Sequence, residues 1–195
     1  MRDLRHIIGD RKLIHSYILE TTKHIVKSPN NDQIFDVAAI KVPLGKIVDV
    51  ICSDGEDSGI ILLGMTGVGK TALMTASTRV FSAMYGKVER LNAQDMIKSI
   101  SNEEGYFISG VHASEYLYID DIGTEHEKYI EFGQIIKPLE QIIHERYNVR
   151  QKGGLFATTN LELKEISDRY GSRVFSRLAE MCTFIKMDGK DFRKS

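Results

Sequence analysis

Short apolar runs alternate along the chain with segments long enough to form helices. The longer segments occupy positions 70–85, 93–102, 128–151 and 162–181. This alternation is typical of a mostly parallel sheet whose strands are joined by crossover helices on both faces. The sequence therefore predicts an α/β fold with a five-stranded sheet. The expected strands are Ile60–Leu63, Val88–Leu91, Tyr116–Ile119, Leu155–Ala157 and Thr183–Ile185.

The chain ahead of the first strand has a helical pattern instead. Residues 11–27 place apolar side chains at helical spacing, and a second short helix is expected over Leu44–Cys52, after Pro43. We therefore expect two parts, a helical lead-in over 1–57 and a single α/β domain over 58–195.

The composition and charge of the chain argue against several classes of function. The 195 residues carry 26 basic and 27 acidic side chains, a formal charge of -1, so bulk attraction to nucleic acid or an anionic membrane gains nothing from net charge. No apolar run approaches the roughly 18 residues of a membrane-spanning helix, so no membrane partner is expected. Cys52 and Cys182 form neither a disulfide framework nor a Cys-x-x-Cys metal pair. A reducing cytoplasm is the expected location.

A glycine-rich loop follows the first expected strand. Its sequence, Gly64 to Thr71, satisfies G-x-x-x-x-G-K-[ST] and precedes a helical segment. The glycines let successive backbone N–H groups turn around phosphate oxygens, Lys70 would reach the β- and γ-phosphates, and Thr71 would bind Mg²⁺. A chance glycine-rich turn is the alternative. The predicted ATP- or ADP-binding residues are Gly64, Met65, Thr66, Gly67, Val68, Gly69, Lys70, Thr71 and Ala72.

Two carboxylates end the expected strand over Tyr116–Ile119, which resembles a Walker B element. Asp120 would hold the metal, and Asp121 would face the attacking water. Asp121 is one methylene shorter than the Glu common at this position, so slow hydrolysis is expected. Glu125 is an alternative catalytic acid, or simply the first-turn acid of a following helix. Without the glycine-rich loop, the acid pair would be interpreted as a solvated turn.

Polar groups also follow the next expected strand. Asn160 would contact the γ-phosphate or the attacking water, or it caps the helix after it. Arg173 and Arg177 are four residues apart and share a helical face. They suit phosphate recognition across a subunit boundary, although such pairs are commonly surface ion-pair partners.

The order of these motifs resembles the AAA+ ATPases of the DnaC/DnaI helicase-loader group, with the IstB transposition helpers similar. The resemblance covers about residues 58–194. It implies an AAA+ P-loop fold, with Arg177 as an arginine finger, Arg173 as its neighbour or substitute, and Arg193 as a second sensor. It also implies a nucleotide-dependent homo-oligomer that acts on a replicative helicase or a recombinase, with single-stranded DNA a further candidate partner.

The sequence also leaves alternative functions and further candidate contacts open. A P-loop small-molecule kinase and a nucleotide-gated adaptor with little turnover are alternative functions. Arg146, Tyr147, Arg150 and Lys152 are candidate nucleic-acid contacts, or they form a solvated helix terminus whose cations complement the helix dipole. Tyr106 and Phe107 are a stacking surface or core residues. The six histidines show no metal-ligand spacing and are expected on the surface or in packing.

Overall fold

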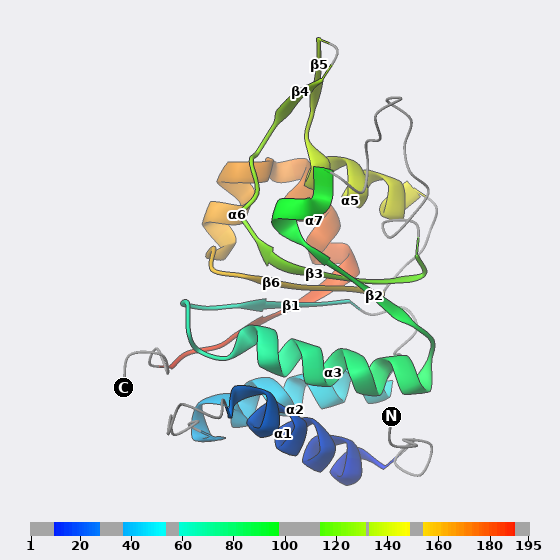
Figure 1. Ribbon diagram of the computed structural model, residues 1–195, viewed down its shortest axis with the longest axis vertical. Coiled ribbons are helices and arrows are strands. Elements are labelled where there is room, and N and C mark those ends of the chain that lie inside the picture. The colour runs from blue at the N-terminus through cyan, green and yellow to red at the C-terminus, as the bar shows by residue number, and fades with distance from the viewer. Residues whose placement is uncertain are drawn as a thin grey trace.

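The structure is a computed structural model that describes residues 10–27, 37–53, 59–97, 114–131, 133–148 and 154–189. Its centre is a five-stranded sheet with strand order β2-β3-β6-β1-β7, in which every pair of neighbours is parallel (Figure 1). The five expected strands and the α/β fold class are confirmed. The strands are β1 (Gly59–Leu63), β2 (Val88–Asn92), β3 (Tyr116–Ile122), β6 (Leu155–Thr159) and β7 (Cys182–Lys186).

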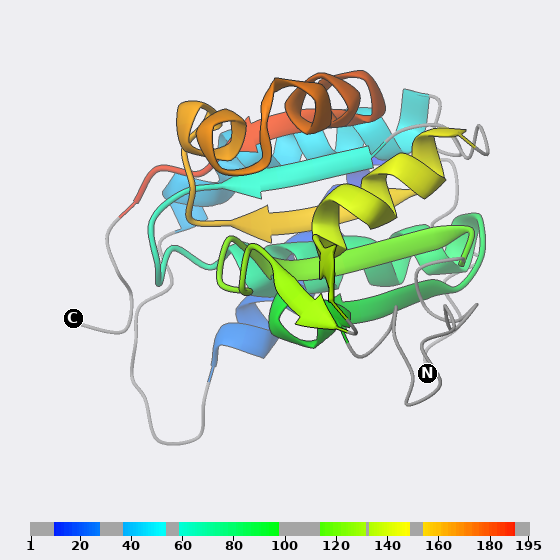
Figure 2. The ribbon, with the colours of Figure 1, turned by 90° about the horizontal axis from the view of Figure 1, so that it is seen from above.

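Helices cover both faces of the sheet (Figures 1 and 2). One face packs against α1 (Arg11–Val26), α2 (Val37–Ser53) and α3 (Lys70–Met84), and the other against α5 (Pro138–Asn148), α6 (Leu163–Tyr170) and α7 (Ser172–Met181). Because side chains alternate along a strand, each strand contributes to both cores. Ile60 and Leu62 belong to the first core, whereas Ile61 and Leu63 belong to the second.

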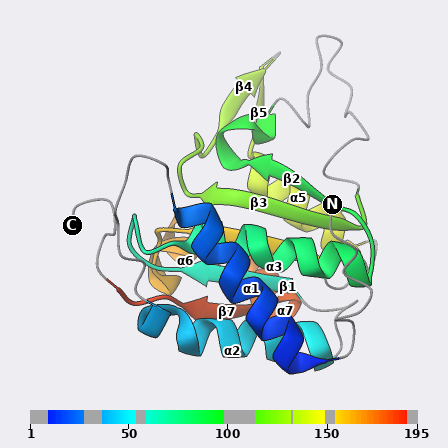
Figure 3. The same ribbon diagram turned by 60° about the horizontal axis from the view of Figure 1, so that its bottom comes forward.

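The two N-terminal helices extend the first core. Figure 3 shows α1 lying across α2 and α3, and the buried Ile14 and Ile18 of α1 join the cluster that includes sheet residues. Phe81 of α3 packs edge-on against Phe156 of β6, with ring centroids 4.8 Å apart. The lead-in helices therefore pack as part of this core, while the expected boundary at residue 57 stays a prediction.

One helix begins earlier than the sequence suggests. The expected helix over Leu44–Cys52 is α2, which starts at Val37 and contains Pro43 in its interior. Ile40, Leu44 and Ile47 form a buried stripe at helical spacing, so tertiary packing outweighs the hydrogen bond that proline cannot donate.

The connections also differ from four simple crossover helices. The segment expected to form a helix over 128–151 begins with an antiparallel hairpin, β4 (Tyr129–Glu131) and β5 (Gln134–Ile136), before α5. The segment over 162–181 divides into α6 and α7 at Gly171, whose φ of 85° favours glycine. The segment over 93–102 begins with a short 3-10 helix, η2 (Ala93–Asp95), and its residues beyond 97 lie outside the described ranges.

Candidate nucleotide site

The strand order brings three motifs to one edge of the sheet. Strand β6 lies between β1 and β3, so the carboxyl ends of these three strands are neighbours. The glycine-rich loop follows β1, the acid pair lies near the carboxyl end of β3, and Asn160 follows β6. In open parallel sheets this edge is where ligands bind, because loops from adjacent strands diverge there.

The glycine-rich loop connects β1 directly to α3, as the motif requires. Gly69 caps the helix with a φ of 88°, in the left-handed region that glycine adopts without strain. Gly64 approaches the backbone after β7 so closely that an added Cβ would lie 2.3 Å from the carbonyl oxygen of Met187. The loop conformation therefore depends on glycine at both ends, and the N-terminus of α3, the positive end of the helix dipole, adjoins the loop.

Lys70 links the loop to β6. Its side chain is only 5% exposed, and its Nζ donates to the carbonyl oxygens of Gly64 (2.7 Å) and Met65 (2.8 Å) and to Oδ1 of Asn160 (2.7 Å). A buried ammonium requires such acceptors because desolvation is costly. The same contacts hold the charge at the mouth of the loop, where phosphate oxygens would replace carbonyl oxygens as acceptors.

Asp120 is the centre of a second set of contacts. Its Oδ1 accepts from three hydroxyl groups, while its Oδ2 accepts from the guanidinium of Arg90 at 2.5 Å. Burial alone would raise the pKa of Asp120, but hydrogen bonds and the Arg90 charge outweigh burial and lower it. The carboxyl group is therefore ionised at neutral pH. The hydroxyl donors are Thr158 (2.6 Å), Tyr118 (2.6 Å) and Thr71 (3.1 Å).

The oxygen atoms of Thr71 and Asp120 suit a divalent metal of the magnesium type. Thr71 and Asp120 present a hydroxyl and a carboxylate oxygen 3.1 Å apart, and hard oxygen ligands are those that Mg²⁺ prefers. Within the residues that the structure describes, no cluster of three or more His, Cys, Asp or Glu side chains offers a rival metal site. Thr71 and Asp120 remain the residues that could hold the cation.

Asp121 occupies a bulge in β3. The register with β6 shifts between Ile119 and Ile122, so β3 carries one more residue than its partner there. Asp121 has a φ of 60°, a conformation uncommon outside glycine, and its N–H donates to Oγ1 of Thr158 at 2.9 Å. The bulge changes the direction of successive side chains at the point where the two acids occur.

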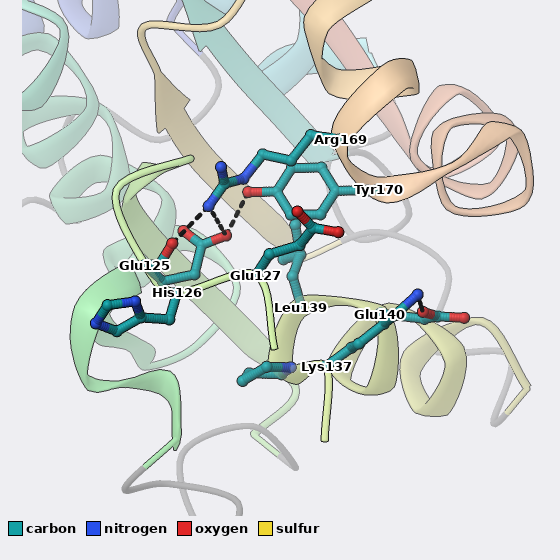
Figure 4. A pocket seen from close by; sticks show the side chains of 9 residues that line it. Glu125, His126, Glu127, Lys137, Leu139, Glu140, Arg169 and Tyr170 are labelled. Atoms are coloured by element: carbon teal, nitrogen blue, oxygen red, sulfur yellow. Dashed lines mark hydrogen bonds and ion pairs between the residues drawn. The ribbon is translucent and has the colours of Figure 1, made fainter. Parts of the chain in front are cut away.

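Glu125 lies in a small pocket beside α6, shown in Figure 4. It is 5% exposed, and its carboxylate accepts from the backbone N–H of Gly123 (2.8 Å) and from the hydroxyl of Tyr170. Arg169 donates to its carbonyl oxygen at 2.5 Å. Burial, followed by the adjacent carboxylate, raises the pKa of Tyr170, so that hydroxyl stays protonated and can donate.

These contacts tie Glu125 to α6, and the expectation that it begins a helix is wrong. Strand β4 follows it, because the segment after the acid pair pairs as a hairpin. The catalytic role considered for Glu125 stays a prediction.

Asn160 is exposed and bound to Lys70, so the two predicted phosphate contacts are brought together. The alternative that Asn160 caps the next helix is wrong. Helix α6 begins at Leu163 and is capped by Glu162, which forms a reciprocal capping box with Glu165.

The two candidate arginines of α7 lie apart from these contacts. Arg177 contacts α5: its guanidinium lies 2.6 Å from Nδ1 of His144 and 4.9 Å from the ring centroid of Tyr147. Arg173 is exposed in the first turn of α7. Arg193 lies outside the described residues.

Arg146 is not a nucleic-acid contact. It is 2% exposed, and its guanidinium donates to the carbonyl oxygens of Ser114 (2.7 Å) and Glu115 (2.8 Å) ahead of β3. The sequence did contain the signal, since Arg146 continues the helical spacing of Leu139 and Ile142 and so shares their buried face.

The other candidate nucleic-acid contacts have mixed outcomes. Tyr147 is partly exposed, and its hydroxyl donates to Glu180. Arg150, Lys152, Tyr106 and Phe107 lie outside the described ranges, as do His6 and His112. Of the other histidines, His15 is half-buried and the rest are exposed at positions 24, 126 and 144, as expected.

Sequence reasoning missed three residues that bind Asp120. Tyr118 precedes it by two positions on the same face of β3, a spacing that could have indicated the contact. Thr158 and Arg90 come from neighbouring strands, and their contacts depend on strand order and register. No local pattern around either residue predicts them.

Together the parallel sheet and the glycine-rich loop between β1 and α3 define the α/β fold of P-loop NTPases. A crystal structure of the DnaC helicase loader matches 91% of this chain and 99% of its own, with a TM-score of 0.64 and 22% sequence identity. A crystal structure of DnaI matches 92% of this chain and 99% of its own, with a TM-score of 0.61 and 15% identity. The chain has the fold of these proteins, and the resemblance expected from the motif order is confirmed at that level.

A replication initiator has the same fold over part of its length. DnaA from Aquifex aeolicus, bound to AMPPCP, matches 89% of this chain but only 51% of its own, with a TM-score of 0.59 and 16% identity. No protein-family model matches the sequence, and no curated protein matches it either. None of the described helices combines the length and apolarity needed to cross a membrane.

The bridging role of Thr158 can be tested by two substitutions. Thr158→Val keeps the shape but removes the hydroxyl that contacts both Asp120 and the N–H of Asp121. We expect it to lower the free energy of unfolding by about 1–3 kcal/mol, the cost of leaving a buried polar group unsatisfied. Thr158→Ser keeps the hydroxyl and should cost only about 0.8 kcal/mol for one methyl group. Urea denaturation measures both, and a Val variant as stable as the wild type would contradict the role.

Proposed function

We propose that this protein is an ATP-binding and ATP-hydrolysing AAA+ switch that acts in cytoplasmic DNA replication as a loader of a replicative helicase. The observation that carries the proposal is the convergence of Lys70 with Asn160 and of Thr71 with Asp120 at one sheet edge. Its fold, shared with the DnaC helicase loader and DnaI, supports the replication role.

Different residues of the site would bind different parts of the nucleotide phosphates. Backbone N–H groups between Gly64 and Ala72 would surround the phosphate oxygens, and Lys70 would place its charge between the β- and γ-phosphates. Mg²⁺, held by Thr71 and Asp120, would neutralise developing charge on the phosphates when bound. Asn160 would reach the γ-phosphate, since its amide already lies against Lys70.

Hydrolysis requires a group that orients water. The water oxygen bonds to the γ-phosphorus and releases a proton to solvent, the bond to the β–γ bridging oxygen breaks, and ADP and inorganic phosphate result. We assign the water-orienting role to Asp121, because it directly follows Asp120 in the sequence while the carboxylate of Glu125 is bound within its own pocket. The shorter reach of Asp implies slow turnover.

Arginines from an adjacent subunit would complete the site. Arg177 contacts α5 rather than the phosphate loop, an arrangement that suits presentation to the nucleotide of a second copy. Arg173, exposed one turn away, would assist or substitute for it. Arg193 would act as an in-chain sensor. The proposal thus includes a nucleotide-dependent homo-oligomer.

The first test is nucleotide turnover without an acceptor. The wild type should release inorganic phosphate from ATP, and Lys70→Ala should abolish release and weaken ATP binding at least about tenfold, since a buried phosphate-binding charge is lost. Lys164→Ala removes an equal charge from an exposed position on α6 and should change neither. Consumption of ATP that strictly requires an added small-molecule acceptor would instead indicate a kinase.

Subunit mixing tests the arginine finger. Arg177→Ala and Asp120→Asn should each be inactive alone, whereas a mixture should recover part of the wild-type phosphate release. In mixed assemblies some interfaces combine an intact Asp120 site with an intact Arg177. Native mass spectrometry confirms that mixed assemblies form. Mixed assemblies with no recovery would show that Arg177 does not act in trans.

The loader role is tested with the purified replicative helicase of the host. Immobilised wild-type protein should retain the helicase with ATP and release most of it with ADP, because the γ-phosphate stabilises the assembled state. Lys70→Ala, which cannot respond to ATP, is the matched control and should retain equal, low amounts under both conditions. Binding of a transposase or recombinase in place of the helicase would indicate the transposition-helper function.

A further inference from the structure

Arg90 reaches the candidate metal site from the edge of the sheet. It lies on β2, where its register partner on β3 is Tyr118, so both side chains share the face that carries Asp120. The guanidinium carbon lies 5.1 Å from the centroid of the Tyr118 ring, and NH2 lies 2.5 Å from Oδ2 of Asp120. Ring and carboxylate together fix the position of the charge.

Arg90 differs in kind from the other groups bound to Asp120. Thr71, Tyr118 and Thr158 contribute neutral hydroxyls, and all three bind Oδ1. Among the residues that the structure describes, Arg90 is the one cation that contacts this carboxylate, and it binds Oδ2. The Arg90 side chain is 50% exposed, whereas that of Asp120 is 7% exposed.

This difference determines how the two kinds of donor respond to a divalent cation. A neutral hydroxyl can turn its hydrogen away and offer its oxygen, as Thr71 would do in binding Mg²⁺. A guanidinium has no acceptor atom and keeps its charge at any relevant pH, so it repels a second cation at the same carboxylate. Because half of the Arg90 side chain is in solvent, it can leave Oδ2 without exposing the core.

We propose that Arg90 is a built-in competitor of the metal at Asp120. It provides a counter-charge to a buried carboxylate, and it raises the Mg²⁺ concentration needed to strengthen nucleotide binding. Arg90 is thus a positioning residue that tunes metal affinity rather than a group that touches the reacting atoms. The inference rests on the proposed ATP site and goes beyond it by assigning this regulation to one residue.

The test measures nucleotide binding instead of turnover. A fluorescent, non-hydrolysable ATP analogue is titrated with and without Mg²⁺, and the ratio of the two dissociation constants gives the Mg²⁺ enhancement. Arg90→Gln removes the charge but keeps a planar donor. Its enhancement should rise about threefold or more, and half-saturation should occur at lower Mg²⁺, because the competing cation is gone.

Matched variants separate charge from folding. Arg90→Lys keeps a cation within reach of Asp120 and should retain an enhancement close to that of the wild type. Arg79→Gln makes the same charge change at an exposed position on α3 and should have no effect. The ratio removes any effect of Arg90 on nucleotide affinity that is independent of metal, and thermal melting without nucleotide shows that each variant is folded.

Each outcome is decisive for one hypothesis. An unchanged or smaller enhancement in folded Arg90→Gln would overturn the competitor role while leaving the ATP site intact. Equal rises in the Gln and Lys variants would show that the charge is not the cause, and would also overturn it. Failure of the wild type to bind the analogue at any Mg²⁺ concentration would instead contradict the proposed function.

Discussion

The site depends on the hydrogen bonds that hold the Lys70 ammonium in the loop between β1 and α3. This charge is buried, so it requires acceptors, and it obtains them from two loop carbonyls and from Asn160 beyond β6. Those acceptors converge only if three conditions hold together. Helix α3 must begin at the end of the loop, the loop glycines must adopt their conformations, and β6 must lie next to β1. The geometry of the glycine-rich loop and the packing of the sheet therefore depend on each other, and a change in one changes the other.

Much of this arrangement could be predicted from sequence because the relevant signals are local. Buried strands of a parallel sheet are continuous apolar runs, and β1, β3 and β6 read in that way. Motifs that end such strands must meet at one edge whenever the strands are parallel neighbours. The consensus motif identifies the loop, and this rule predicts that Asp120 and Asn160 lie beside it, although the sequence does not specify the strand order.

The features that differ from the sequence-based predictions depend on contacts between segments that are distant in the sequence. The sequence predicts a helix that begins after Pro43, but packing of the neighbouring residues continues α2 through this proline. Arg146 looks solvated beside Tyr147, yet the carbonyl groups ahead of β3 bury it. Arg90 has no local signal, because only the pairing of β2 with β3 directs it toward Asp120. Charge alone did not indicate whether an arginine lies in solvent or in the protein core.

The hydrogen bonds of Glu125 limit how the end of β3 can move. The stretch from Asp121 to Glu125 is fastened at both ends, by Thr158 on β6 and by Tyr170 at the close of α6. Tyr170 is the last residue of α6, and Gly171 separates it from Ser172, where α7 starts. A displacement of the acidic strand end must therefore either break one of these partly buried hydrogen bonds or pull the α6–α7 corner with it. Two hydrogen bonds thus connect β6, the central strand, through this stretch to the corner from which the helix bearing Arg173 and Arg177 begins.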